Sequence, residues 1–241
     1  MKTIVIIQAR MGSSRLPGKI LMPLANVDVL TYVVERSKNI KGINEVVVAT
    51  SCLQQDDVVE NWCIANSVDC FRGSETDVLD RYVKAAKKYK PDFVIRVTAD
   101  CPFLDYKLAS EMVKKIEGAN TDFIRIEGDL PRGLAVEVFS FQTLQYNHEH
   151  GNEARHREHV TYYAYENKEE FTWSIVETNK NLQHPELRIT LDTEEDYQLC
   201  KRIADHFKND LLVPSKDVVK YLLDNPEIAK INAHIEQKPV V

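Results

Sequence analysis

The residues with the most evident chemical potential lie near the N-terminus, in the segment Gln8–Lys19 (QARMGSSRLPGK). This segment contains Arg10, Arg15 and Lys19, and the chain has no acidic residue before Asp28. The whole chain, in contrast, carries 37 acidic and 31 basic side chains and a net charge of -6. The segment is therefore a local concentration of positive charge, which suits an anionic ligand such as a phosphate group.

The small residues of this segment support the same interpretation. Gly12 lets the backbone approach a ligand closely, and Ser13 and Ser14 add hydroxyl donors. Successive N–H groups in such a turn can form an anion-binding nest. One cation about 4 Å from a phosphate oxygen contributes roughly 4 kcal/mol at an effective dielectric constant of about 20, before desolvation costs. Three cations would therefore hold a triphosphate.

The main alternative is a solvated loop whose basic side chains contact only water. However, the segment directly follows the apolar run Thr3–Gln8, and open α/β sheets bind ligands at the carboxyl ends of their strands. The segment matches neither G-x-x-x-x-G-K-S/T nor G-x-G-x-x-G. These absences argue against a P-loop kinase and a Rossmann dehydrogenase.

Two aspartates follow later apolar runs. Asp100 comes after Asp92–Thr98, and Asp192 comes after Leu187–Leu191. Mg²⁺ takes one or two carboxylates together with phosphate oxygens and water, so two aspartates from separate strand ends are a sufficient protein contribution. An ordinary turn residue is the alternative for Asp100. A helix N-cap is the alternative for Asp192, although Thr193 could take that role instead.

Four polar residues follow the third apolar run and open a helical pattern, namely Arg72, Ser74, Asp77 and Arg81. Their position at the carboxyl end of a strand directs them toward the base or ribose of a nucleotide. An ordinary helix start explains Asp77 almost as well, because acidic residues there complement the helix dipole.

The elements that must position these side chains alternate between short apolar runs and helix-period segments. The expected strands are Thr3–Gln8, Glu45–Thr50, Val68–Phe71 and Asp92–Thr98. The expected helices between them show apolar faces at Leu30, Val33, Val34 and Ser37, then Val58, Val59, Trp62 and Cys63, then Val78, Leu79, Tyr82, Val83 and Ala86. This alternation predicts a three-layer α/β fold with a mostly parallel sheet.

The second half of the chain continues this mixture. We expect helices at Leu108–Glu117, Phe141–His148, Ala154–Tyr165, Glu194–Phe207 and from Ser215, and strands at Ala135–Phe139, Thr172–Glu177 and Leu187–Leu191, with a short tail containing Pro226 and Pro239. No repeat or linker divides the sequence. We therefore predict a single domain over residues 1–241, in which the stretch from about 120 to 180 is a candidate for an inserted lobe.

Composition narrows the class of protein. The 241 residues are 44% hydrophobic and 28% charged, which fits one packed globular domain. The negative net charge and the lack of a basic stripe argue against nucleic-acid binding, and no apolar run approaches the roughly 18 residues of a membrane span. The five cysteines form no C-x-x-C pair, which suits a reducing compartment. We therefore expect a cytoplasmic protein that contacts neither membrane nor nucleic acid.

The segment Ile7–Lys19 resembles the opening signature of the cytidylyltransferases that include the CMP-Kdo and CMP-sialic acid synthetases. The match is closest to the spore coat polysaccharide biosynthesis branch. The resemblance extends over nearly the whole chain, through the blocks Arg72–Tyr82, Arg96–Asp105, Gly133–Phe139, Arg157–Thr161 and Arg188–Thr193.

This resemblance implies a nucleotide-diphosphosugar-transferase type, Rossmann-like fold, with CTP and Mg²⁺ as co-substrates, pyrophosphate as a product and a homodimer in many members. It implies catalytic roles for Arg15, Lys19 and Asp100, and metal binding by Asp100 and Asp192. Together with the positions discussed above, it predicts nucleotide contacts at Ala9, Arg10, Met11, Gly12, Ser13, Arg15, Lys19, Arg72, Ser74, Asp77, Arg81, Thr98 and Ala99.

The resemblance also predicts acceptor contacts, at Arg132, Gly133, Glu137, His156, Glu158 and His159. Glu137 is equally compatible with an outward-facing strand position. Ala135 departs from the family pattern, which has an aspartate at this place, so the identity of the acceptor stays open.

The spacing of His156 and His159 would also allow a transition-metal pair on one helix face, but no further ligand has suitable spacing. A substrate-facing or solvated helix is the favoured interpretation. Contact with a second subunit is equally compatible with the block Arg157–Thr161.

The leading hypothesis is therefore a Mg²⁺-dependent nucleotidyltransferase that couples CTP to a small acidic or phosphorylated sugar-like acceptor. One rival is a glycosyltransferase of related fold, which would normally present a D-x-D metal motif; the segment Asp100–Pro102 has none. A second rival is a non-catalytic nucleotide-binding regulator. The combination of Arg15, Lys19, Asp100 and Asp192 argues against it, because a sensor needs no pair of metal-binding carboxylates.

Overall fold

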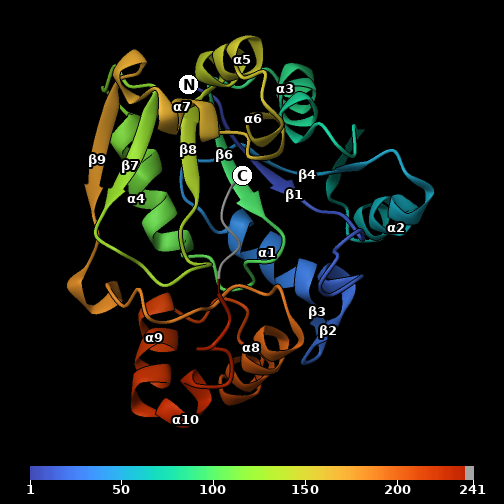
Figure 1. Cartoon of the computed structure of the whole chain (residues 1–241), viewed down its shortest axis with the longest axis vertical. Coiled ribbons are helices and arrows are strands. Elements are labelled where there is room, and N and C mark those ends of the chain that lie inside the picture. Colours follow the sequence, from blue (N-terminus) through green and yellow to red (C-terminus); the bar gives the residue numbers. More distant parts are fainter. Residues whose placement is uncertain (237–241) are drawn as a thin grey trace.

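The computed structural model describes residues 1–236 of the chain, and its centre is a seven-stranded sheet (Figure 1). The strands lie in the order β5-β4-β1-β6-β8-β7-β9, and only β8 runs antiparallel to its neighbours. Their bounds are β1 Thr3–Gln8, β4 Glu45–Ser51, β5 Asp69–Gly73, β6 Phe93–Thr98, β7 Phe123–Glu127, β8 Glu137–Ser140 and β9 Trp173–Glu177. The predicted α/β fold with a mostly parallel sheet is confirmed.

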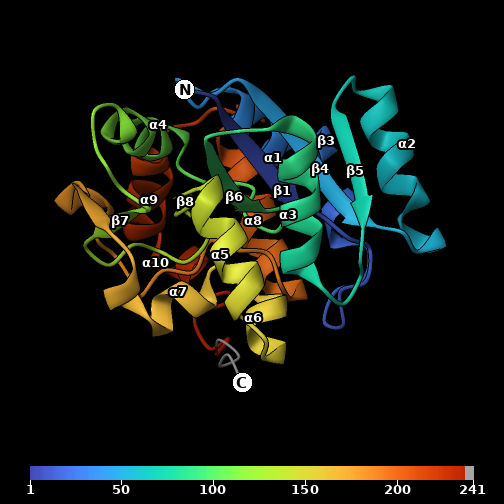
Figure 2. The same ribbon diagram turned by 90° about the horizontal axis from the view of Figure 1, so that it is seen from above.

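Helices cover both faces of this sheet (Figure 2). One face packs against α1 (Val29–Lys38), α2 (Asp57–Ala65) and α4 (Tyr106–Ile116), and the other lies under α3 (Val78–Tyr89), α5 (Phe141–His150), α6 (Ala154–Glu158) and α7 (Tyr162–Glu166). Along β1, Val5 and Ile7 enter the first core while Ile4 and Ile6 enter the second. Burial on both faces explains why β1 is apolar throughout rather than alternating.

A third apolar core lies beyond the carboxyl edge of the sheet, at the bottom of Figure 1. It is formed mainly by α8 (Glu194–His206), α9 (Ser215–Asp224), α10 (Pro226–Ala229) and the hairpin of β2 (Pro23–Leu24) and β3 (Val27–Asp28). Arg36 of α1 is fully buried and donates to the carbonyl oxygens of Leu211 and Val213. This arginine therefore attaches the C-terminal helices to the sheet domain.

Short 3-10 turns occur at Lys19–Leu21, Gln54–Asp56, Lys168–Glu170 and Lys180–Leu182. Within residues 1–236, no helix is long and apolar enough to cross a membrane. The stretch 120–180 contributes β7, β8 and β9 to the central sheet and α5, α6 and α7 to one of its faces.

The predicted strand Leu187–Leu191 is wrong. Within residues 1–236, this segment forms only one isolated bridge, between Arg188 and Arg132. Leu187, Ile189 and Leu191 are buried in the third core, and their alternation with Arg188 and Thr190 in the sequence produced the strand-like pattern, although those two residues are buried as well. The backbone N–H of Leu191 donates to the carbonyl oxygen of Asp100, so the segment crosses the end of β6 instead of joining the sheet.

Three further features of the secondary structure differ from the prediction. The expected helix Ala154–Tyr165 is divided into α6 and α7, because His159 leaves the helical conformation and Thr161 turns its hydroxyl toward Glu137. The last helix is followed by the short α10, which begins at Pro226. β7 was not predicted, and the tail around Pro239 lies outside the described residues.

Candidate active site

The predicted phosphate loop leaves the carboxyl end of β1 and ends in a tight turn before Lys19. Met11 anchors it, since its N–H donates to Asp56 at 2.7 Å and its carbonyl oxygen accepts from Ser13 and Gly18. Gly18 has a φ of 73°, a left-handed conformation that favours glycine. Gly18 is the N-cap of the short helix Lys19–Leu21, so the turn places Lys19 at the first position of that helix.

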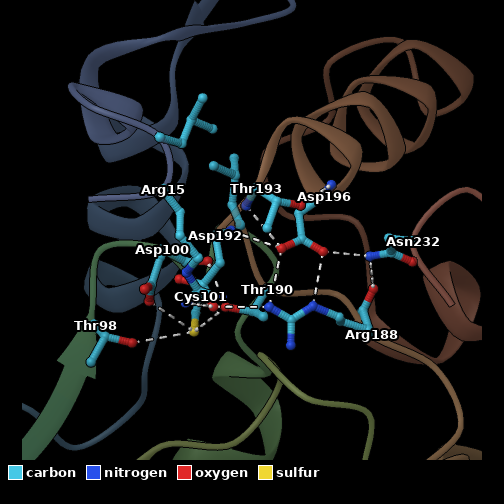
Figure 3. Close-up of polar contacts among 12 residues, drawn as sticks. Arg15, Thr98, Asp100, Cys101, Arg188, Thr190, Asp192, Thr193, Asp196 and Asn232 are labelled. Atoms are coloured by element: carbon cyan, nitrogen blue, oxygen red, sulfur yellow. Dashed lines mark hydrogen bonds and ion pairs between the residues drawn. The ribbon is translucent and has the colours of Figure 1, made fainter. Parts of the chain in front are cut away.

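Lys19 lies between the two predicted metal-binding aspartates. Its Nζ donates to Asp100 Oδ2 at 2.9 Å, to Asp192 Oδ1 at 2.8 Å and to the carbonyl oxygen of Leu191 at 2.8 Å. Arg15 makes an ion pair with Asp192 Oδ2 at 3.0 Å. Figure 3 shows Arg15, Asp100 and Asp192 converging from three different parts of the chain. The juxtaposition that the sequence predicts is thus present.

The electrostatics of this cluster favour fully charged groups. Burial alone would lower the pKa of Lys19, but the carboxylates of Asp100 and Asp192 outweigh it and raise that pKa. Burial alone would raise the pKa of Asp100, but the charge and hydrogen bond of Lys19 hold it below its ordinary value. The ammonium and the carboxylate therefore stabilise each other's charged forms.

The structure also decides the alternatives for the two aspartates. Thr193, not Asp192, caps α8, because its side chain accepts from the N–H of Asp196. Asp192 is thereby left to face Lys19 and Arg15. Asp100 likewise directs its carboxylate to Lys19 rather than acting as a simple turn residue.

These side chains line one side of a cleft of about 1080 Å³. Of the predicted site residues, the cleft is lined by Arg10, Gly12, Ser13, Arg15, Lys19, Thr98, Ala99, Asp100, Arg132, Gly133, Glu137, Glu158, His159 and Asp192. Five cationic and five acidic side chains of the described residues line it, so charges of the two signs are equal in number in the cleft. A cleft of this size accommodates a nucleotide together with a small second substrate.

The opposite wall of the cleft carries the predicted acceptor residues. Glu137 of β8 pairs with Arg96 of β6 at 2.5 Å and accepts a hydrogen bond from Thr161 at 2.7 Å. Burial alone would lower the pKa of Arg96, but Glu137 raises it, whereas burial lowers the pKa of His159. Arg132 is exposed. This wall therefore presents one fixed ion pair and one accessible cation.

The predicted base and ribose residues do not line this cleft. Arg72 pairs with Asp57 and Glu60 on α2, and Asp77 caps α3 and pairs with Arg157. In addition, Ser74 caps the turn before α3 by accepting from the N–H of Asp77, and the guanidinium of Arg81 is buried. Ala9 and Met11 pack in the core beneath the loop and likewise lie outside the cleft lining.

His156 is also placed away from the cleft. It is buried, its Nε2 lies 2.6 Å from Glu166, and its Nδ1 accepts from the N–H of Glu153. Its environment is that of a structural histidine inside the α6–α7 pair, so the shared face with His159 is not formed. Within residues 1–236, no group of three or more His, Cys, Asp or Glu side chains could hold a metal ion.

Sequence reasoning missed several residues around the cluster. Arg96 is a charged residue inside the apolar run of β6, and that interruption was a usable signal. Arg188 stands four residues before Asp192 and contacts it at 2.9 Å. Asp196 is fully buried beside both, and Asn232 donates to it at 2.7 Å. No sequence spacing connects Asn232 with the other residues.

The donor set around Lys19 suits Mg²⁺. Two carboxylate oxygens and one carbonyl oxygen converge on the ammonium group, and oxygen donors are the ligands that this ion prefers. The ammonium itself shows that a cation is well accommodated between Asp100 and Asp192. Phosphate oxygens and water would complete the coordination of a divalent ion there.

Comparison with known proteins agrees with this architecture. The family model described as "Cytidylyltransferase" matches residues 4–238. The chain is 35% identical to the spore coat polysaccharide biosynthesis protein SpsF of Bacillus subtilis over 93% of this chain and 95% of that protein. It is 30% identical to the 3-deoxy-manno-octulosonate cytidylyltransferase of Anaeromyxobacter sp. (strain K), over 72% and 75% of the two chains.

A solved cytidylyltransferase from Leptospira borgpetersenii has a TM-score of 0.89 and 32% identity, with 99% of this chain and 100% of that chain covered. The similarity thus includes the loop, the sheet and the C-terminal helices together. The family match over nearly the entire sequence and the shared fold lead to one conclusion: this chain belongs to the cytidylyltransferase family.

Proposed function

We propose that this protein transfers CMP from CTP to a sugar acid or a phosphorylated sugar-like acceptor and releases pyrophosphate, in the synthesis of a surface polysaccharide or glycoconjugate. The observation that carries this proposal is the position of Lys19 between Asp100 and Asp192, beside Arg15, in a single cleft. The relatives named for spore coat polysaccharide biosynthesis and for 3-deoxy-manno-octulosonate support the class of product.

In this proposal, Arg15 and Lys19 bind the triphosphate, together with the backbone near Gly12. Asp100 and Asp192 would hold a Mg²⁺ ion, which when bound supplies charge neutralisation at the phosphates. The acceptor oxygen attacks the α-phosphorus, and the bond to the pyrophosphate oxygen breaks as the new phosphorus–oxygen bond forms. Positioning and electrostatic stabilisation account for most of the catalysis of such reactions.

The acceptor binds, in this proposal, along the opposite wall of the cleft. Arg132 offers an exposed cation for a carboxylate or phosphate group, and Glu137 offers a carboxylate for sugar hydroxyls. His159 and Glu158 lie on the same wall. The homodimer that the family resemblance implies and the cytoplasmic location that the composition predicts belong to this proposal as well.

The direct test supplies each of the four nucleoside triphosphates with Mg²⁺ and a panel of nonulosonic acids and sugar phosphates, and measures pyrophosphate. We expect release with CTP and at least one acidic acceptor, and none when Mg²⁺ is removed. Absence of pyrophosphate with every pair would favour a nucleotide-binding regulator. Hydrolysis of a supplied nucleotide-sugar would instead favour a glycosyltransferase.

A further inference from the structure

A chain of hydrogen bonds behind Asp192 connects it with the C-terminal segment (Figure 3). Arg188 donates from Nη2 to Asp192 Oδ2 at 2.9 Å, and its Nε donates to Asp196 Oδ1 at 2.9 Å. Its Nη2 also reaches Asp196 Oδ2 at 3.1 Å. One guanidinium therefore joins two carboxylates in a fixed fork, a geometry that lysine cannot reproduce.

Asp196 holds the backbone of the same site. Its Oδ2 accepts from the N–H groups of Asp192 and Thr193 at 2.9 and 3.1 Å. Asn232, near the end of the described chain, donates to Asp196 Oδ1 at 2.7 Å and to the carbonyl oxygen of Arg188 at 3.0 Å. Asp196 is fully buried and Asn232 is 1% exposed, so these contacts are shielded from water.

The two groups of cations around Asp192 differ in their other contacts. Lys19 and Arg15 face the cleft and, under the proposed function, turn to the phosphates. Arg188 is absent from the cleft lining and is committed to buried Asp196. It therefore remains on Asp192 Oδ2 when the other two cations engage a substrate, and it keeps Oδ1 directed toward the position of Lys19 Nζ, which Asp100 also contacts.

We infer that Arg188 and Asp196 are positioning residues for the metal-binding carboxylate of Asp192, and that Asn232 completes this anchor from the C-terminal segment. The inference rests on the proposed function, because it assigns a task to residues behind the site. Partners of metal ligands in other proteins orient the ligand and set its affinity for the ion. Here Arg188 contacts the carboxylate of Asp192, and Asp196 accepts from the backbone N–H of the same residue.

The test compares Arg188→Lys with the wild type by titrating Mn²⁺ in the presence of saturating CTP and following bound Mn²⁺ by electron paramagnetic resonance. We expect about a tenfold higher Mn²⁺ midpoint, the size typical of lost outer-shell partners. Turnover should recover at high metal concentration, while KM for CTP at saturating metal changes little. A merely structural defect would lower the active fraction without moving the midpoint.

Arg36→Lys is the matched control, since Arg36 is another buried arginine that anchors the C-terminal helices but, among the described residues, donates only to carbonyl oxygens and the Ser215 hydroxyl. We expect it to lower the melting temperature and leave the Mn²⁺ midpoint unchanged. Asn232→Ala retains the Arg188–Asp196 pair and should raise the midpoint less than Arg188→Lys does.

An unchanged Mn²⁺ midpoint in Arg188→Lys, or equal shifts in Arg188→Lys and Arg36→Lys, would overturn the positioning role. If Arg188→Lys does not fold, Asn232→Ala decides the question by the same measurement. A wild-type protein that neither binds Mn²⁺ with CTP nor depends on metal for pyrophosphate release would overturn the proposed function as well. Failure of the positioning role alone can therefore be distinguished from failure of the proposed function.

Discussion

The two walls of the cleft are built on different principles. On the loop side, Lys19 and Arg15 are paired with Asp100 and Asp192 at 2.8 to 3.0 Å. On the opposite side, Arg96 and Glu137 form one ion pair, but Arg132 and Ala135 are exposed. The charged groups of the first wall compensate one another, whereas the second wall also has exposed positions that leave room for different partners. The contrast suggests that the shared chemistry resides on the loop side and the choice of acceptor on the other.

Replacing Lys19, the cation between the two aspartates, should have the largest effect, and that effect is on stability. In Lys19→Met, Asp100 and Asp192 lose their shared partner, and breaking a buried ion pair costs about 3 to 5 kcal/mol. We expect a strongly lowered melting temperature that Mg²⁺ partly restores, because the two carboxylates become available to the ion. Lys87→Met, on the exposed face of α3, serves as the control. Equal responses of the variant and the wild type to Mg²⁺ would argue against a cation site between the aspartates.

The next largest effect should be on turnover. Asp100→Asn removes one carboxylate from the loop side of the cleft, while Lys19 keeps its hydrogen bonds to Asp192 and to the Leu191 carbonyl oxygen. We expect turnover to fall by at least two orders of magnitude with the fold intact, since such a contact contributes on the order of 3 kcal/mol in the transition state. Pyrophosphate release and circular dichroism would measure both properties, with the surface variant Asp205→Asn as a control. Near-wild-type activity would remove Asp100 from the mechanism.

A substitution on the wall opposite the loop should change acceptor binding rather than stability. Arg132→Ala takes away an exposed cation, so the unfolding free energy should change by no more than about 0.5 kcal/mol. We expect KM for an acidic acceptor to rise by roughly tenfold, the size of a charge-assisted hydrogen bond, with KM for CTP nearly unchanged. Steady-state kinetics with each substrate varied in turn would measure the split. A parallel rise in both constants would mean that the two walls are not functionally separate.

The smallest expected effect is the dependence of protein stability on pH. Because the pKa of Asp100 is lowered in the folded protein, its stabilising contribution is fully present above about pH 4 and is lost as the pH falls through the folded value. The raised pKa of Lys19 gives a contribution that is fully present below about pH 10 and is lost as the pH rises through the folded value. The stability difference between the wild type and Asp100→Asn should thus be constant near neutral pH and shrink in acid. A difference independent of pH would contradict this account.

Much of the fold could be predicted from local patterns. The strands at Thr3–Gln8 and Phe93–Thr98 are apolar runs buried on both faces, and the amphipathic α3 shows its buried face at helical spacing. The false strand at Leu187–Leu191 alternates apolar and polar residues in the sequence, but its apolar side chains enter a core of helices, and Arg188 and Thr190 are buried as well. A strand-like pattern of residue types does not report whether a neighbouring strand supplies the hydrogen bonds.

The site residues could also be predicted in part from the sequence. The predictions that failed did so because residue type and spacing do not identify a side chain's partner. Lys19 and Asp100 were recognisable because they follow β1 and β6, and parallel strands bring their carboxyl ends to one edge. Asp192 was recognised from a run that is not a strand, and it reaches the site because that run crosses the end of β6. Arg72 and His156 have equally suitable residue types, yet their charges are used in local pairs outside the cleft. A side chain's type and spacing do not determine which partner it finds.

By itself, therefore, the sequence determined the sheet-and-helix alternation, the cationic turn after the first strand and the membership of the cytidylyltransferase family. Only the tertiary structure decided that Lys19 lies between Asp100 and Asp192, and that Arg188, Asp196 and Asn232 support Asp192 from behind. The physical reason is that local propensities act over a few residues. Charge pairing joins Lys19 and Asp192 across 173 positions, and a buried hydrogen bond joins Arg36 and Ser215 across 179, at distances that only the packed chain defines.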